Sequence, residues 1–225
     1  MLRKLSQLAI ALAASVAFSN ASAIVIIIDD FNSPDQFIAD QAGGGATVQF
    51  AAGGVPYNRY LSHELLAGPN TTAGSGSSVN IGSQAFPVGS LEVANANGRD
   101  SVVLVGWTIP NGLILDSSNG PASFLFNVLL SDGNPTSAGL FFNNNPLGSF
   151  VIPANTTNQF LAFNVTAAQQ NMVNLGGNLE LRLNGETGWD MSIDSLGVRI
   201  PEPASIALVG LALLAAGVAS RRRKV

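Results

Sequence analysis

The sequence predicts an all-β, antiparallel sandwich for the main part of the chain. Between residues 24 and 200, glycine, asparagine, serine and proline recur every few positions, and short apolar runs of strand length lie between them. In residues 179–183 leucine alternates with charged residues, which is typical of a strand with one buried and one solvated face. Helical signals are few and no β-α-β alternation is present, which argues against a parallel sheet.

The expected strands follow one another with polar turns between them. Thr166 can cap a short helix over residues 167–175 that Gly176 ends, and Ser33 with Pro34 can open one helical turn. In the last strand the apolar phase slips near position 194, which indicates a β-bulge. The number of short strands in one domain favours a jelly-roll-like β-sandwich. In chain order the strands span residues 24–28, 47–50, 59–65, 90–93, 101–108, 113–115, 123–130, 138–142, 149–152, 160–164, 179–183 and 189–200.

Composition excludes several classes of function. Residues 24–200 contain 13 acidic and four basic residues, which gives a formal charge of −9 against −4 for the whole chain. Nucleic acid and anionic lipid both require basic patches, so neither is expected as a partner of this domain. The chain has no cysteine and one histidine, His63, which excludes thiol catalysis, cysteine-based zinc sites and a histidine cluster within one chain.

Residues 1–23 have the three parts of a secretory signal peptide. Arg3 and Lys4 precede an apolar stretch at residues 5–18, and Ala21 and Ala23 provide the small side chains of a cleavage site. Cleavage after Ala23 would start the mature chain at the next residue. The sequence therefore predicts an N-terminal signal peptide helix and an exported domain over residues 24–200.

The last 25 residues combine a proline motif, an apolar segment and a basic end. The apolar run at residues 204–219 would span roughly 24 Å as a helix, which is short for a hydrocarbon core of about 30 Å. The basic end should remain in the cytoplasm and leave the domain outside. The segment is predicted to form a short transmembrane helix, which is compatible with either a permanent or a temporary anchor. The motif is Pro201, Glu202 and Pro203, and the basic end contains Arg221, Arg222 and Arg223.

This order of features closely resembles the PEP-CTERM sorting signal of exported bacterial proteins, over residues 200–225. The resemblance implies that exosortase, a membrane protease-transpeptidase, recognises the segment at 201–225 and removes it. It also implies a transient anchor in the inner membrane of a Gram-negative bacterium, followed by a final place at the cell surface or in the extracellular matrix. It carries no activity for residues 24–200.

The two ends of the domain, residues 26–31 and 189–200, loosely resemble the terminal strands of carbohydrate-binding-module-like and galactose-binding-like jelly rolls. The resemblance implies that these strands pair and that a structural calcium can sit between them. Its ligands would be Asp29, Asp30 and Asp194, since calcium takes six to eight oxygen ligands. The alternative is that these aspartates are solvated and close strands and turns. No other cofactor is expected.

Aromatic side chains are the candidates for stacking on sugar rings. Trp189 follows a threonine–glycine turn and is the expected sugar contact, whereas Trp107 lies in a strongly apolar strand and is expected in the core. Tyr57 and Tyr60 are further candidates. The asparagine run at residues 143–145 can supply polar partners in a surface loop.

No catalytic residue is predicted. Glu180 and Glu186 are separated by an Asn-Gly turn signal, so they read as exposed acids of a hairpin. His63 and Glu64 are adjacent in a strand and face opposite ways. We expect a non-enzymatic exported protein with a structural or adhesive role in the exopolysaccharide or biofilm matrix, with sugar contact. The alternative is a polysaccharide-acting enzyme that uses Glu180, Glu186 or Asp190.

Overall fold

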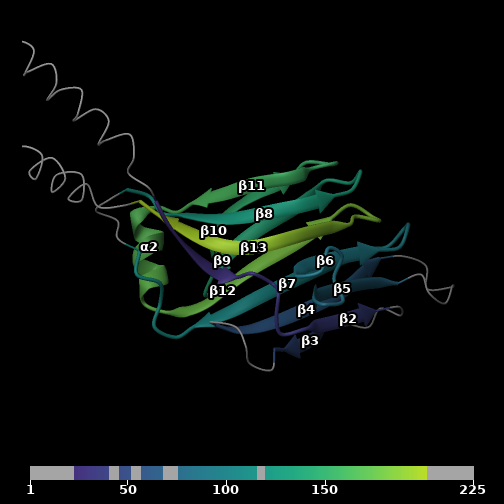
Figure 1. Ribbon diagram of the computed structural model, residues 1–225, viewed down its shortest axis with the longest axis horizontal. Coiled ribbons are helices and arrows are strands. Elements are labelled where there is room, and N and C mark those ends of the chain that lie inside the picture. Colours follow the sequence, from purple (N-terminus) through teal and green to yellow (C-terminus); the bar gives the residue numbers. More distant parts are fainter. Residues whose placement is uncertain (1–22, 41–45, 52–56, 68–75, 116–119, 202–225) are drawn as a thin grey trace, which may run out of the picture.

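The computed structural model describes residues 23–40, 46–51, 57–67, 76–115 and 120–201. In these residues two antiparallel sheets pack face to face, with one short helix at one end (Figure 1). The predicted all-β sandwich is therefore confirmed. The signal peptide with Ala21, Glu202, Pro203, the arginine cluster at 221–223 and the expected C-terminal helix lie outside the described residues. Within the described residues, no helix is both long enough and apolar enough to span a bilayer.

The first sheet, sheet A, has seven strands in the order β11-β8-β13-β6-β5-β2, with β1 also paired to β13. The first half of β13 pairs with β6 and the second half with β1, so β13 has neighbours along both sides. Ile24 lies opposite Ile200, and the expected pairing of the terminal strands is confirmed. The strands are β1 (Ile24–Asp29), β2 (Gln36–Asp40), β5 (Ser77–Gly82), β6 (Ser90–Asn95), β8 (Ser123–Ser131), β11 (Thr157–Asn164) and β13 (Met191–Ile200).

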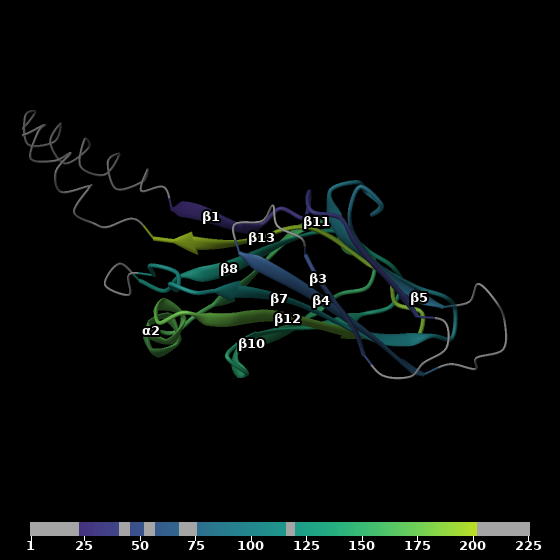
Figure 2. The same cartoon turned by 90° about the horizontal axis from the view of Figure 1, so that it is seen from below.

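The second sheet, sheet B, has six strands in the order β10-β9-β12-β7-β4-β3. Figure 2 separates β1 and β13 of sheet A from β7 and β12 of sheet B. The strands are β3 (Thr47–Phe50), β4 (Asn58–Ala67), β7 (Asp100–Ile109), β9 (Thr136–Phe142), β10 (Asn145–Ile152) and β12 (Gly177–Gly185).

Side chains of alternate residues on both sheets fill the space between the layers. In β12 the three leucines at 179, 181 and 183 are buried, whereas Glu180 and Arg182 point outward, as the alternation predicts. Trp107 is fully buried, which confirms its expected place in the core. Each large apolar side chain removed from water in this way contributes about 1.5–3 kcal/mol. The core therefore fixes which residues of sheet B face solvent.

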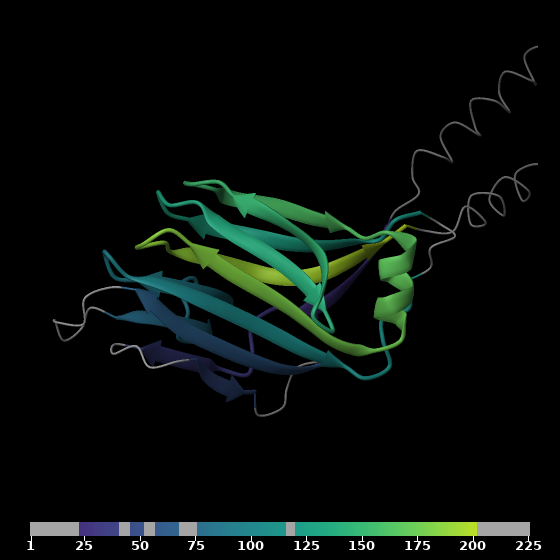
Figure 3. The ribbon, with the colours of Figure 1, turned by 180° about the vertical axis from the view of Figure 1, so that it is seen from behind.

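Helix α2 (Ala167–Asn174) closes one end of the sandwich, which we call the α2 end. The Thr166 side chain accepts a hydrogen bond from the Gln169 backbone, and the Gln169 side chain accepts one from the Thr166 backbone. This capping box confirms the predicted start of the helix. Figure 3 shows that the described chain leaves the sandwich at this same end.

Several local expectations are wrong. Residues 36–40 form strand β2 rather than following a helical turn, and β5 has no counterpart among the predicted strands. Residues 113–115 are not a strand, because they hydrogen-bond to α2 instead of a neighbouring strand. The irregularity in β13 is confirmed, with register shifts on either side of Ile193.

Candidate functional site

The outer face of sheet B carries a row of side chains that comes from five neighbouring strands. Strand pairing places Phe50 opposite Tyr60, Tyr60 opposite Gly106, Gly106 opposite Glu180, and Glu180 opposite Phe141. Residues paired in this way point to the same face of a sheet. We call this set the sheet-B row, together with two polar neighbours. Its side chains are Phe50, Tyr60, Glu180, Phe141, Arg182 and Asn144.

Tyr60 lies across the middle of this row. Its hydroxyl donates a hydrogen bond of 2.6 Å to Glu180 Oε1, although β7 runs between the two strands that carry them. The ring reaches across because residue 106 is glycine. A Cβ atom at Gly106 would lie 2.1 Å from Tyr60 Cζ. The ring is thus held against the outer face of the sheet, where it is partly exposed.

Electrostatics keep the Tyr60 hydroxyl in its neutral form. Burial of the phenol and its hydrogen bond to Glu180 both raise the pKa of Tyr60 above its usual range. A phenol with a raised pKa remains a hydrogen-bond donor at neutral pH and is not activated as a nucleophile. Tyr60 is therefore suited to binding rather than to covalent chemistry.

Arg182 completes the row on the other side of Glu180. Its Nε donates to Glu180 Oε2 at 3.1 Å, and its Nη2 donates to Asn144 Oδ1 at 2.7 Å. Its guanidinium lies 4.1 Å from the centroid of the Phe141 ring. This stacking and the two polar contacts hold the guanidinium flat, while 36% of the side chain stays exposed.

The row is long and open. Neighbouring strands lie about 4.8 Å apart, so the four steps from β3 to β9 span roughly 19 Å. Phe50, at one end, is 76% exposed and its ring centroid is 6.2 Å from that of Tyr60. Flat rings, a planar guanidinium and fixed carboxylate and amide oxygens can together stack on a ligand ring and hydrogen-bond its hydroxyl groups.

The sugar contact expected for Trp189 is wrong, because this side chain is fully buried. Its ring lies over the end of β12, where a Cβ atom at Gly185 would be 2.3 Å from Trp189 Cγ. Its indole Nε1 donates to the carbonyl of Ser101 at 3.3 Å. Trp189 is a core residue that no ligand can reach.

The three carboxylates that the resemblance implies as calcium ligands, those of Asp29, Asp30 and Asp194, do not converge, and the structure favours the alternative given for them. The buried Asp29 carboxylate accepts hydrogen bonds from Arg59 Nη1 and from Trp107 Nε1, so a guanidinium takes the place of a metal. Asp194 accepts from an asparagine side chain on β8, at 3.1 Å. Among the described residues, no group of three or more histidine, cysteine, aspartate or glutamate side chains could hold a metal ion.

Asp30 behaves as the alternative interpretation expected. Its carboxylate accepts the backbone N–H of Asn32 at 3.2 Å, which forms a local turn just after β1, where Asp30 is exposed. Hydrogen bonding to Asn32 lowers the pKa of Asp30. It is a solvated turn residue.

The carboxylates required by the enzymatic alternative are not paired. Glu180 is in the middle of β12 and Glu186 follows that strand, so five strand steps, about 17 Å, already separate Glu180 from Gly185. Asp190 precedes β13 in the other sheet and accepts the backbone N–H of Asn95 at 2.6 Å. Burial raises the pKa of Asp190. Glu180 and Glu186 therefore do not form the close carboxylate pair that the enzymatic alternative requires.

His63 is a core residue and takes no part in the row. It is fully buried, and its Nε2 is hydrogen-bonded to Ser77 Oγ at 2.7 Å. Burial lowers its pKa, so it is neutral at neutral pH. Glu64, its neighbour in β4, lies on the opposite, outward face, as expected.

Sequence reasoning identified Tyr60, Glu180 and the 143–145 loop separately, but not their meeting on one face. It did not identify Arg182 or Phe141 as site residues. A glycine inside the apolar strand at 101–108 was an available signal, because glycine in a strand interior often marks a close approach by another group.

Residues 199–224 match the PEP-CTERM protein-sorting motif. The chain therefore carries an export and sorting signal of the kind that exosortase processes, as predicted. No curated protein sequence is similar enough to the chain to count as a match.

Several solved structures share the sandwich arrangement at low sequence identity. The CBM36-1 domain of a multidomain xylanase from the hindgut metagenome of Trinervitermes trinervoides is 14% identical, with a TM-score of 0.32 over 73% of this chain and 96% of that chain. The family 11 carbohydrate-binding module of Clostridium thermocellum, solved with a β-1,3-1,4-mixed-linked tetrasaccharide, is 12% identical, with a TM-score of 0.35 over 81% and 98%. The Stig cyclase Fisc of Fischerella sp. TAU is 16% identical, with a TM-score of 0.41 over 81% and 100%. These scores are too low to carry an argument about what this chain binds.

Proposed function

We propose that the domain at residues 24–200 binds an extracellular polysaccharide through the sheet-B row. In this proposal the chain is exported, held briefly in the inner membrane by its C-terminal segment, and released from that segment by exosortase. The mature domain then has a structural or adhesive role at the cell surface or in the biofilm matrix of a Gram-negative bacterium. The sorting motif supports the route, and the row supports the binding.

The observation that carries the proposal is the position of the Tyr60 ring. Glu180 fixes its hydroxyl, and Gly106 lets the ring lie against the sheet. A ring that is already fixed loses little conformational freedom when a sugar ring stacks on it. Arg182 and Asn144, held beside it, can meet the hydroxyl groups of the same ligand.

Charge and length define the ligand further. The domain has a formal charge of −9, from 13 acidic and four basic residues, and an acidic surface repels acidic polysaccharides. The row spans roughly 19 Å across the strands, which suits a chain of several sugar units rather than a single ring. We therefore expect a neutral, linear polysaccharide.

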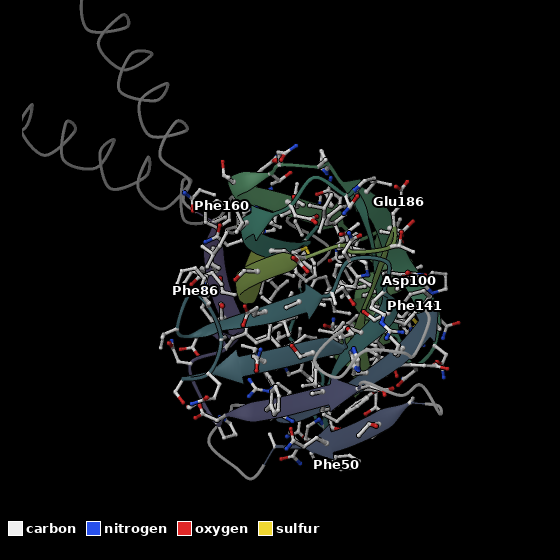
Figure 4. The ribbon with its side chains drawn as sticks, turned by 90° about the vertical axis from the view of Figure 1, so that its right-hand side faces the viewer. Phe50, Phe86, Asp100, Phe141, Phe160 and Glu186 are labelled. Carbon is white, nitrogen blue, oxygen red and sulfur yellow. The ribbon has the colours of Figure 1, made fainter. Side chains whose placement is uncertain are left out.

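Affinity electrophoresis in gels that contain the native exopolysaccharide, or a panel of neutral polysaccharides, tests this proposal on the full chain in detergent. The variants Tyr60→Ala and Phe141→Ala should lose the retardation of the parent protein. Phe160→Ala is the matched control, because Phe160 is a 69% exposed aromatic on β11 of the other sheet (Figure 4). No retardation by any polysaccharide, or equal loss in the control, would refute the proposal.

A further inference from the structure

The two ends of the sandwich differ in charge. Among the described residues at the α2 end, which are 24–26, 109–115, 120–123, 142–147, 163–178 and 198–201, Arg199 is the only charged residue. Asp116 follows this region in sequence and lies outside the described residues. At the opposite end, Asp100, Asp132, Glu186 and Asp190 lie at the ends of strands, and Figure 4 shows Asp100 and Glu186 there. The acidic charge of the described residues is therefore concentrated away from the α2 end.

The α2 end also presents two highly exposed apolar side chains. Ile114 is 87% exposed and Leu175, which caps α2, is 85% exposed. Ile24, at the start of β1, is 53% exposed at the same end. These large apolar side chains lie at an end whose described residues carry one charge, that of Arg199, and exposed apolar surface of this kind marks an interaction site.

The fold holds Ile114 outward. Its neighbours Leu113 and Leu115 are buried, with 3% and 2% of their surface exposed. The Leu113 N–H donates to the carbonyl of Val173, and the Asn174 side chain both accepts from the Leu115 N–H at 2.7 Å and donates to the Leu115 carbonyl at 2.9 Å. The loop is therefore fixed to α2, and the exposure of Ile114 is a property of the folded domain.

The chain leaves the fold at this end, next to its apolar tail. Strand β13 ends at Ile200, and the apolar run of the sequence begins at residue 204. Four residues span at most about 14 Å in any conformation. If the tail is in the membrane, the α2 end lies within this distance of the bilayer surface.

We propose that the α2 end rests on the outer surface of the bilayer while the tail holds the chain there, with Ile114 and Leu175 in contact with lipid. The net charge of the domain argues against contact with an anionic lipid surface, whereas this proposal places one end of the domain on a bilayer. The two statements agree because the acidic charge is unevenly distributed over the domain. The α2 end, whose described residues include no acid, can approach lipid while the acidic end is repelled, so the strands stand upright and the sheet-B row faces sideways. This inference uses the transient membrane anchor of the proposed function, but not polysaccharide binding.

Site-directed fluorescence on the full chain tests the contact, and the absence of native cysteine makes single labels simple. Ile114→Cys and Leu175→Cys are each labelled with a polarity-sensitive fluorophore and reconstituted in phosphatidylcholine vesicles that carry a nitroxide on the acyl chain. Both labels should shift their emission to shorter wavelength and lose most of their fluorescence to the quencher. Val151→Cys is the control, because Val151 is 62% exposed at the distal end of β10.

The outcomes separate the steps of the inference. Flotation of the vesicles shows whether the C-terminal segment anchors the chain. If the chain does not float with the vesicles, the anchor is refuted and so is this inference. A chain that floats, but whose labels at 114 and 175 behave like the label at 151, overturns the lipid contact alone. An emission shift at 114 and 175 that appears only when exosortase is co-reconstituted also overturns the lipid contact, because the enzyme would then cover this surface. Polysaccharide retardation is unaffected by all three outcomes.

Discussion

Replacing Arg59 by methionine should strongly destabilise the domain, because Arg59 makes a buried ion pair with Asp29. Neither side chain has any exposed surface. Arg59 Nη1 donates to the two Asp29 oxygens at 2.9 and 2.8 Å, Nε donates to Gln36 Oε1 at 2.6 Å, and Nη2 donates to the Pro34 carbonyl at 2.5 Å. The network joins the end of β1 to sheet B across the core. Methionine keeps an apolar stem but provides none of these donors.

The expected magnitude follows from what remains buried. Without Arg59, the Asp29 carboxylate keeps only Trp107 Nε1, at 2.7 Å, and the Phe31 N–H, at 2.9 Å, as donors. Removing one partner of a buried ion pair costs about 3–5 kcal/mol. For a domain of this size each 1 kcal/mol lowers the melting temperature by about 2–4 °C, so the melting temperature should fall by about 6–20 °C.

Urea unfolding followed by tryptophan fluorescence measures this cost, because Trp107 and Trp189 are both fully buried. The matched control is Arg182→Met, which breaks a pair whose side chains are 36% and 13% exposed. A partly exposed pair contributes at most about 1 kcal/mol. If both variants lose the same free energy of unfolding, the buried pair does not have the importance argued for it.

Three further outcomes are expected. In Gly106→Ala the new Cβ would lie 2.1 Å from Tyr60 Cζ, so the ring must move, and polysaccharide retardation should fall as in Tyr60→Ala; retardation at the parent level would contradict the flat-ring geometry. Burial lowers the pKa of His63 from 6.5, so the unfolded chain binds a proton at this histidine at a higher pH than the folded chain does. The neutral, buried His63 therefore adds its full contribution to the free energy of unfolding above pH 6.5, and this contribution is lost as the pH falls below that value. Titration of unfolding should therefore show a smaller acid loss in His63→Gln than in the parent, and identical slopes would exclude His63 as the cause. Thr166→Ala removes the acceptor of the Gln169 N–H and should cost about 1 kcal/mol in thermal unfolding, whereas an unchanged midpoint would show that the cap contributes nothing.

The parts of the fold that were predictable have strong local patterns. Leucine alternation in β12 and the capping residue of α2 each specify a conformation within a few neighbouring residues. Strand β2 is not predicted because its buried residues are the polar Gln36 and Ile38, while the larger Phe37 is 54% exposed, so the usual hydrophobicity and size cues point to the wrong face. The order of strands in the two sheets depends on contacts between distant segments, which a single sequence does not display.

The candidate site was less predictable than the fold for the same reason. Tyr60 and Glu180 are 120 residues apart, and they meet only because β4 and β12 both pair with β7. Trp189 was misassigned because the turn before it suggested exposure. Gly185 lets its ring fold over the end of β12, and burial there could not be read from neighbouring residues.

Strand β13 has a mechanical consequence. It lies between β8 on one side and β1 with β6 on the other, and its last residue, Ile200, is the point from which the chain leaves the domain. A force applied at Ile200 acts along the length of β13. The backbone hydrogen bonds on both sides of β13 are then loaded in shear and must break together. A pull across the strands would break them one at a time at lower force. Any attachment through Ile200 would therefore load the domain along its strands, in the direction in which both hydrogen-bond ladders of β13 resist together.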